Sequence, residues 1–268
     1  MKTLIAGTDF TPASVNACRY AALLAKKLNC KLVIFNLFQT PVFHSNAGLV
    51  GFSFQSLKRE SQKGLEGIIS ALIKDFPGLK ISALQSPNTL KDELETYIHK
   101  HQVMAVVLGL EAKDKISKFI YGSEGVKLGG KLAAPVIIVP SRYTQHKLGT
   151  LLLAVDNQMK VNAPSLKTLN AFVKASQSHV KAVHIRTPEE LILPLKSTTI
   201  KLGSTPVEIE IAKGETIEKG VKKYSTANTV DLVAIISRKH SALYNFFSET
   251  VTKRVAFVST IPVMAIHE

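Results

Sequence analysis

Four positions in the first half of the chain have the types and spacing that could hold a phosphate-bearing ligand. Gly109, Ala112, Gly122 and Ser123 follow the pattern G-x2-A-x9-G-S. Gly122 and Ser123 are expected to open a helix, whose first backbone N–H groups have no partner within the helix and attract anions. The absent side chain at Gly109 would let a ligand approach the backbone closely. The pattern therefore predicts phosphate binding.

A carboxylate placed directly after the first apolar run adds a second kind of contact. The run ends in Gly7-Thr8-Asp9, and the Asp9 carboxylate or its adjacent backbone can accept a hydrogen bond from an adenine amino group. Glu124 falls in the first turn of the helix expected after Tyr121 and places negative charge where phosphates would arrive. Lys113 and Lys115 lie in the intervening loop and could offset that charge, although surface lysines are the simpler interpretation.

The elements that must position these residues predict an α/β fold. Short, continuous apolar runs alternate with helical patterns, which is typical of a parallel sheet covered on both faces. Thr11 as N-cap and Pro12 at the first helical position mark the start of the first helix. The expected strands are 3–8, 31–37, 79–84, 103–108 and 135–139, and the expected helices lie near 12–28, 55–75, 89–101 and 122–133.

The chain then repeats this plan. Leu4-Ile-Ala-Gly-Thr-Asp9 returns as Leu151-Leu-Leu-Ala-Val-Asp156, and Ala134-Pro-Val returns as Ile261-Pro-Val. The segment 186–205 is expected to be mostly loop. We therefore expect two tandem open parallel five-stranded sheets with helices on both faces, a Rossmann-like arrangement. The second set of strands is expected near 150–155, 179–185, 206–211, 231–236 and 262–266, and the polar segment 140–149 would link domains at 1–142 and 148–268.

Composition excludes several classes of protein. The net charge is +14, but no run of five Lys or Arg occurs and aromatic residues are not interleaved with the basic ones, so nucleic acid is not expected as a partner. No apolar stretch is long enough to span a membrane, and the N-terminus does not read as a signal peptide. Cys18 and Cys30 are expected to be buried, reduced thiols. A cytoplasmic protein without a metal site is the resulting expectation.

The motif, Asp9, the strand order and the duplication together resemble the universal stress protein family of the bacterial UspA type, in a tandem two-domain form. The family signature is G-x2-G-x9-G-[ST], so Ala112 replaces its second glycine. The resemblance implies an adenine-nucleotide α-hydrolase-like fold that binds ATP, with Mg²⁺, in the N-terminal domain. It implies that Asp9 and Leu37 flank the base, that Leu108, Gly109 and Ala112 line the ribose and phosphate path, and that Gly122, Ser123 and Glu124 cap the phosphates. Gly7 and Thr8, directly before Asp9, belong to the same expected nucleotide-binding set.

The second copy carries Ser237, His240, Glu249 and Thr250 at the four signature positions, so it is expected to keep the fold and lack a triphosphate site. By the same resemblance, the last strands of the two copies would pair edge to edge and form an intramolecular pseudo-dimer. A further homo-oligomer is compatible with this arrangement.

Three functions remain open on the sequence alone. The preferred one is a regulatory stress-response protein that binds an adenine nucleotide. A related enzyme would need a pyrophosphate loop or a His-x-Gly-His motif after the first strand, and Thr8-Asp9-Phe10-Thr11-Pro12 contains neither. A scaffold of the same fold that has abandoned nucleotide is the third, and Ala112 and Glu124 favour it.

Overall fold

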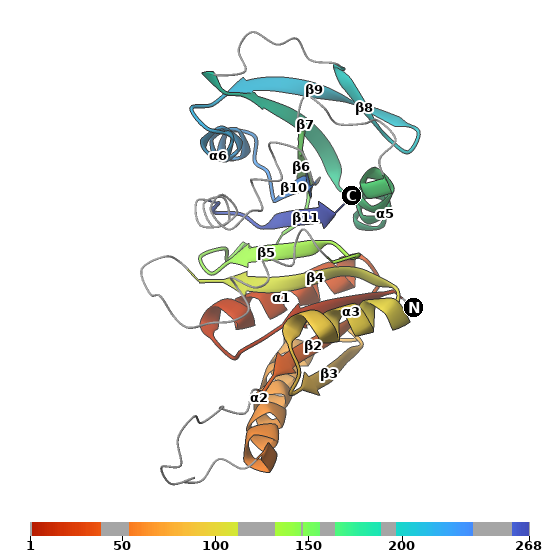
Figure 1. The fold of residues 1–268 in the computed structure, drawn as a ribbon, viewed down its shortest axis with the longest axis vertical. Helices are drawn as coiled ribbons and strands as arrows, with labels where there is room; N and C mark the ends of the chain where they lie inside the picture. The colour runs from red at the N-terminus through yellow and green to blue at the C-terminus, as the bar shows by residue number, and fades with distance from the viewer. Residues whose placement is uncertain are drawn as a thin grey trace.

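The computed structural model has a mixed α/β fold built on one mostly parallel sheet of eleven strands. Its strand order is β3-β2-β1-β4-β5-β11-β10-β6-β7-β9-β8. The N-terminal strands lie at the lower end of the molecule and the C-terminal strands at the upper end, with β5 and β11 side by side between them (Figure 1). The structure describes residues 2–38, 54–111, 132–145, 147–155, 164–188, 197–237 and 259–267.

The first half of the chain forms five parallel strands, as the apolar runs predict. Its elements are β1 (Thr3–Gly7), α1 (Pro12–Lys27), β2 (Lys31–Leu37), α2 (Phe54–Asp75), β3 (Ile81–Ser86), α3 (Leu90–Lys100), β4 (Val103–Leu110) and β5 (Val136–Pro140). Helix α1 begins where the sequence predicts, because the Thr11 side chain accepts a hydrogen bond from the Ser14 amide and Pro12 follows it. Most of the helix expected at 122–133 lies outside the described residues, and Leu132 and Ala133 are not helical.

The second half repeats the strand order of the first. Its elements are β6 (Thr150–Val155), α5 (Pro164–Ser176), β7 (His179–Arg186), β8 (Thr199–Leu202), β9 (Thr205–Lys213), α6 (Ile217–Ala227), β10 (Leu232–Ser237) and β11 (Val263–His267). Strands β6, β7, β9, β10 and β11 take the places of β1 to β5 in order. The duplication inferred from sequence is therefore a duplication of topology.

The second half contains one strand that the sequence did not predict. Within segment 186–205, Thr199–Leu202 forms strand β8 antiparallel to β9, and residues 189–196 lie outside the described part of the chain. The two strands turn at Gly203, whose φ of +64° is accessible to glycine at little cost. Gly203 thus makes a tight hairpin between β8 and β9. Among its described residues, the second half therefore has six strands instead of the expected five.

The two halves share one sheet through the antiparallel pairing of β5 with β11. Met264 lies opposite Ile137 in this register, and both side chains are buried. The edge-to-edge pairing of the last strands is thus as the sequence resemblance implied. On one face, α1, α2 and α5 cover a single apolar core that runs through both halves. On the other face, α3 and α6 cover separate cores.

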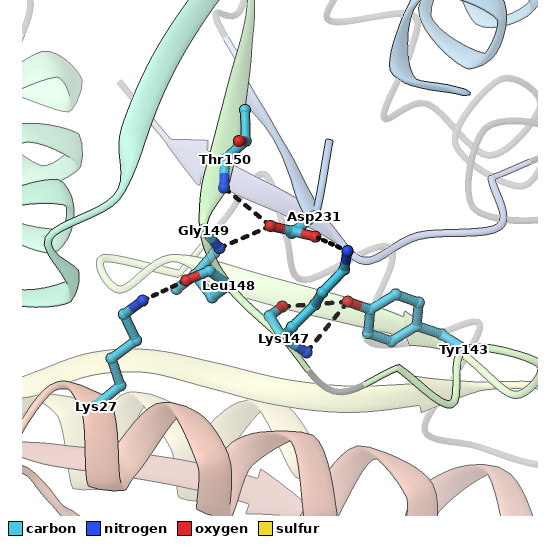
Figure 2. Close-up of polar contacts among 7 residues, drawn as sticks. All are labelled: Lys27, Tyr143, Lys147, Leu148, Gly149, Thr150 and Asp231. Atoms are coloured by element: carbon cyan, nitrogen blue, oxygen red, sulfur yellow. Dashed lines mark hydrogen bonds and ion pairs between the residues drawn. The ribbon is translucent and has the colours of Figure 1, made fainter. Parts of the chain in front are cut away.

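Asp231, just before β10, organises the segment that links the halves. One carboxylate oxygen, Oδ2, accepts hydrogen bonds from the amides of Gly149 (2.7 Å) and Thr150 (2.9 Å) (Figure 2). The other, Oδ1, forms an ion pair of 3.3 Å with Lys147 Nζ. Asp231 is 5% exposed, so these contacts are what stabilise its charge in the interior.

Helix α1 holds the other side of the same segment. Lys27 Nζ donates to the Leu148 carbonyl, and the Tyr143 hydroxyl donates to the Lys147 carbonyl over 3.1 Å (Figure 2). Asn16 Nδ2 donates to the Tyr143 carbonyl over 2.9 Å. The segment between the halves is therefore held by side chains from both halves instead of being a free tether.

Candidate functional site

Strand order brings the two candidate loops of the first half together. In the order β3-β2-β1-β4-β5, the chain adds β2 and β3 on one side of β1 and β4 and β5 on the other. The strand order therefore reverses between β1 and β4, which are parallel, hydrogen-bonded neighbours with Ala6 opposite Val107. The carboxyl ends of these strands lead to Asp9 and Gly109. In open α/β sheets, ligands bind outside the carboxyl ends of the strands at such a reversal. The structure thus places Asp9 and Gly109 at the same edge of the sheet.

The loop after β1 is held by a network of buried polar groups. The amide of Thr8, which is fully buried, donates to the Phe35 carbonyl at 2.8 Å. Its hydroxyl lies 3.0 Å from the hydroxyl of Ser14. Its carbonyl accepts from Asn36 Nδ2 at 2.7 Å, and Asn36 Oδ1 accepts in turn from Ser61 at 2.6 Å. Thr8 therefore positions the loop and does not present its side chain to a ligand.

Sequence reasoning did not select Asn36, Ser14 or Ser61. A signal for Asn36 was available, because it is the one uncharged polar residue inside the apolar run of Leu32-Val-Ile-Phe-Asn-Leu37. A buried polar side chain is stable only when it is hydrogen-bonded, so a polar residue within such a run indicates a structural partner. No comparable pattern marks the serines.

Asp9 is half-buried just after β1, and Thr11 holds one oxygen of its carboxylate. Oδ1 accepts hydrogen bonds from the amide of Thr11 (3.1 Å) and from its hydroxyl (2.5 Å). Oδ2 has no partner among the described residues. Since Thr11 is the N-cap of α1, the start of this helix fixes the orientation of Asp9. An oriented carboxylate oxygen without a partner is suited to accept a hydrogen bond from a ligand.

Phe10 adds strain and exposed aromatic surface beside Asp9. Its φ is +66°, which is costly for a residue with a side chain, and its relative exposure is 38%. The Phe10 ring occupies the space beside Gly64 in α2, because a Cβ built on Gly64 would lie 2.5 Å from the ring. The aromatic ring at this edge was not selected from the sequence.

The missing side chain of Gly109 does not open space for a ligand, contrary to the expectation from the sequence. A Cβ built on Gly109 would lie 2.4 Å from the carbonyl oxygen of Ala13 and 2.8 Å from the amide nitrogen of Ser14. The space left by the missing side chain is therefore filled by the first turn of α1 and is not available to a ligand. Gly109 is needed so that α1 can pack closely on β4.

Three further candidates make structural contacts. Gly7 pairs with Phe35 in the sheet. Leu108 is fully buried in the core beneath α3, so only its backbone could contact a ligand. Leu37 is partly buried at the end of β2. The remaining candidates lie outside the described residues: Ala112, Gly122, Ser123 and Glu124 in the first half, and His240, Glu249 and Thr250 in the second. Ser237 is the last residue of β10.

The described residues contain no group of three or more His, Cys, Asp or Glu side chains that could hold a metal ion. Within those residues, none of the helices is both long and apolar enough to cross a bilayer. Cys18 and Cys30 are free and buried, and burial raises the pKa of the Cys18 thiol to about 12, so this thiol stays protonated at neutral pH. Cys18 therefore does not supply a thiolate nucleophile at neutral pH.

Comparison with known proteins connects this fold to one family. A model of the universal stress protein family matches residues 1–140. The whole fold is similar to a universal stress protein from Archaeoglobus fulgidus DSM 4304, with a TM-score of 0.67 and 15% identity over 98% of this chain and 97% of that one. Comparison with curated proteins found no match.

Two proteins from Pseudomonas aeruginosa share the fold along nearly the full chain. One is a functionally unknown protein from strain PAO1, with a TM-score of 0.56 and 10% identity over 99% of this chain and 92% of that one. The other is a putative universal stress protein from strain UCBPP-PA14, with a TM-score of 0.52, 12% identity and the same coverage. At these identities the likeness establishes a tandem fold and nothing about ligands.

Proposed function

Because the chain belongs to the universal stress protein family, we propose that it is a cytoplasmic regulatory protein of the stress response that binds an adenine nucleotide, ATP, in its N-terminal half. The family match spans 1–140, and the domain boundaries 1–142 and 148–268 remain part of this proposal. We propose no enzymatic activity for the chain.

One observation carries the proposal. The Asp9 carboxylate lies at the carboxyl edge where strand order reverses, with Oδ1 held by Thr11 and Oδ2 without a partner among the described residues. An adenine amino group could donate to Oδ2. Leu37, at the end of the neighbouring strand β2, would pack against the base, and the backbone at Leu108 and Gly109 would lie beside the ribose.

The phosphates of the bound nucleotide would lie against the segment from Ala112 to Glu124. The amides of Gly122 and Ser123 would hold them, and Mg²⁺ would offset the charge that Glu124 adds. In the second half, Ser237, His240 and Glu249 stand at the three glycine positions of the signature, and Thr250 fits its Ser/Thr position. We infer that this half binds no triphosphate.

A scaffold that has lost nucleotide binding is the alternative function. The packing of Gly109 against Ala13 favours it, because this glycine no longer needs a ligand to explain it. Under this alternative the network around Thr8 and Asp9 would serve only to cap α1.

A titration of ATP into the Asp9→Asn variant separates these functions. Asparagine keeps an oxygen for the Thr11 contacts and places an NH₂ group where Oδ2 lies, so a hydrogen-bond acceptor becomes a donor. We expect calorimetry to show ATP binding to the wild type, at least tenfold weaker ATP binding to the variant, and a relative gain for inosine triphosphate. Inosine carries an acceptor where adenine carries its amino group.

The matched control is Asp75→Asn, which changes a surface aspartate paired with Arg19 at the end of α2 and should leave ATP affinity unchanged. Absence of ATP binding to the wild type would support the scaffold. Equal ATP binding by the wild type and Asp9→Asn would remove Asp9 from the site.

A further inference from the structure

A cavity lies at the carboxyl edge of the strands in the second half, and Ser237, the described signature residue, does not line it. It has a volume of about 380 Å³ and lies at the ends of β7 and β9 beside the start of α6. Four cationic side chains line it, together with one acidic side chain: Arg186, Lys213, Lys219, Lys223 and Glu215.

The fold collects these cations from three elements. Arg186 and Lys213 end their strands directly opposite each other in the register of β7 and β9. The strand ends stay joined because the Gly214 amide donates to the Arg186 carbonyl over 3.1 Å. Residues Lys219 and Lys223, one helical turn apart, come from the same face of α6. The fold thereby places four positive charges around this one cavity.

Close packing sets the distance of α6 from the strands. A Cβ built on Gly220 would lie 2.4 Å from Cγ2 of Ile185, so glycine is required for the first turn of α6 to lie on β7. The Thr216 side chain caps that turn by accepting from the Lys219 amide. The first turn of α6, with the positive end of the helix dipole, therefore lies against the ends of the two strands.

The charge in this cavity is not balanced by the described residues. Lys219 pairs with Glu215, and the structure gives no acidic partner to Arg186, Lys213 or Lys223. The Nε atom of Arg186 is buried and makes no hydrogen bond within the part of the chain that the structure describes. Like charges one turn apart destabilise a helix, and a buried donor without a partner is also destabilising. An anion in the cavity would relieve both costs.

We propose that this cavity binds the diphosphate group of a small ligand. Arginine matches phosphate oxygens with two parallel N–H groups, and lysines add point charges around it. A diphosphate carries more negative charge than a single phosphate, which suits three cations that remain after Glu215 has paired with Lys219. This site goes beyond the nucleotide site proposed for the first half and uses none of its residues.

Titration of the full-length protein with inorganic pyrophosphate tests the proposal. We expect saturable binding to the wild type and at least a tenfold weaker affinity in the double variant R186Q/K223Q. The single variant Lys213→Gln, on an exposed strand end, should weaken binding in the same direction. Lys222→Gln is the matched control, because Lys222 lies on the same helix and lines a different cavity with Glu218. Circular dichroism verifies that each variant is folded.

Additional titrations separate this site from other sources of binding. Orthophosphate should bind more weakly than pyrophosphate, and adenosine diphosphate should compete with pyrophosphate if the natural ligand is a nucleotide. Unchanged pyrophosphate affinity in R186Q/K223Q, binding of an acidic peptide in place of pyrophosphate, or no binding at all would each overturn the proposal. ATP affinity measured on Asp9→Asn reports on the first half independently, so the two proposals fail separately.

Discussion

Asn36 and His184 make the same hydrogen bond in the two halves of the chain. Asn36 Nδ2 lies 2.7 Å from the carbonyl of Thr8, and His184 Nδ1 lies 3.0 Å from the carbonyl of Val155. Each residue is buried in the strand beside the first strand of its half. A carbonyl that emerges from the end of a buried strand needs a donor, and the two halves supply it with different side chains. The repeat therefore conserves an interaction whose residue types differ.

Replacing Asn36 by leucine should destabilise the protein by about 1–3 kcal/mol, because the Thr8 carbonyl and the Ser61 hydroxyl would both lose a buried partner. Urea denaturation measures the loss. The matched variant Asn36→His, which introduces the residue type of the second half, should recover part of it. Wild-type stability of Asn36→Leu would show that the hydrogen bond adds nothing.

Gly109→Ala should destabilise the protein by about 1–3 kcal/mol, because the new methyl group would overlap the first turn of α1. The control is Gly67→Ala in the exposed part of α2, where a Cβ meets nothing within 4 Å. That variant should be stabilised by about 0.5–1 kcal/mol through helix propensity. Thermal denaturation compares the two, and a neutral Gly109→Ala would contradict the close packing described above.

Removal of the Asp231 carboxylate should loosen the segment between the halves. Asp231→Ala leaves the amides of Gly149 and Thr150 without their acceptor, at a cost of about 1–3 kcal/mol, whereas Asp231→Asn keeps an acceptor and should cost less. Limited trypsin digestion should cut faster after Lys147 in the alanine variant. Equal digestion rates in both variants and the wild type would show that this carboxylate does not hold the segment.

The free energy of unfolding should fall as pH rises from about 9 towards 12. Burial raises the pKa of Cys18 from 9.0 to about 12 and also raises the pKa of the fully buried Tyr20. The unfolded chain therefore loses these protons at lower pH than the folded chain, and stability declines by about 1.4 kcal/mol per pH unit for each such group.

Urea denaturation at a series of alkaline pH values measures this decline. In Cys18→Ala one ionising group is absent, so stability should depend less steeply on pH, whatever the absolute stability of the variant. An identical slope in Cys18→Ala and wild type would exclude the contribution of this thiol.

A fragment ending at residue 145 should not remain a soluble monomer. It would expose the edge of β5, where Val136, Ile137 and Ile138 are buried against β11 in the intact chain. An unpaired apolar edge strand pairs with other chains. Light scattering after size exclusion should show dimers or larger species. A stable monomer would mean that β5 does not need its partner.

The positions of the parallel strands and the start of α1 could be predicted from the sequence. Continuous apolar runs predict both the parallel strands and their burial, and Thr11 with Pro12 predicts where α1 begins, because strand burial and helix capping depend on residues close in sequence. The duplication and the pairing of the last strands followed from repeated patterns and the family resemblance. Hairpin β8–β9 was missed because one glycine can mark either a loop or a tight turn.

Only the tertiary structure decided which distant groups meet. It showed that α1 fills the space where a side chain of Gly109 would lie, assigned Asn36 to a buried carbonyl, and gathered Arg186, Lys213 and Lys223 around one cavity. These contacts join residues on different strands and helices. Strand order and the close approach of helices create them, and no local pattern of residue types encodes either, so the chemistry of the two edges could be read only from the folded chain.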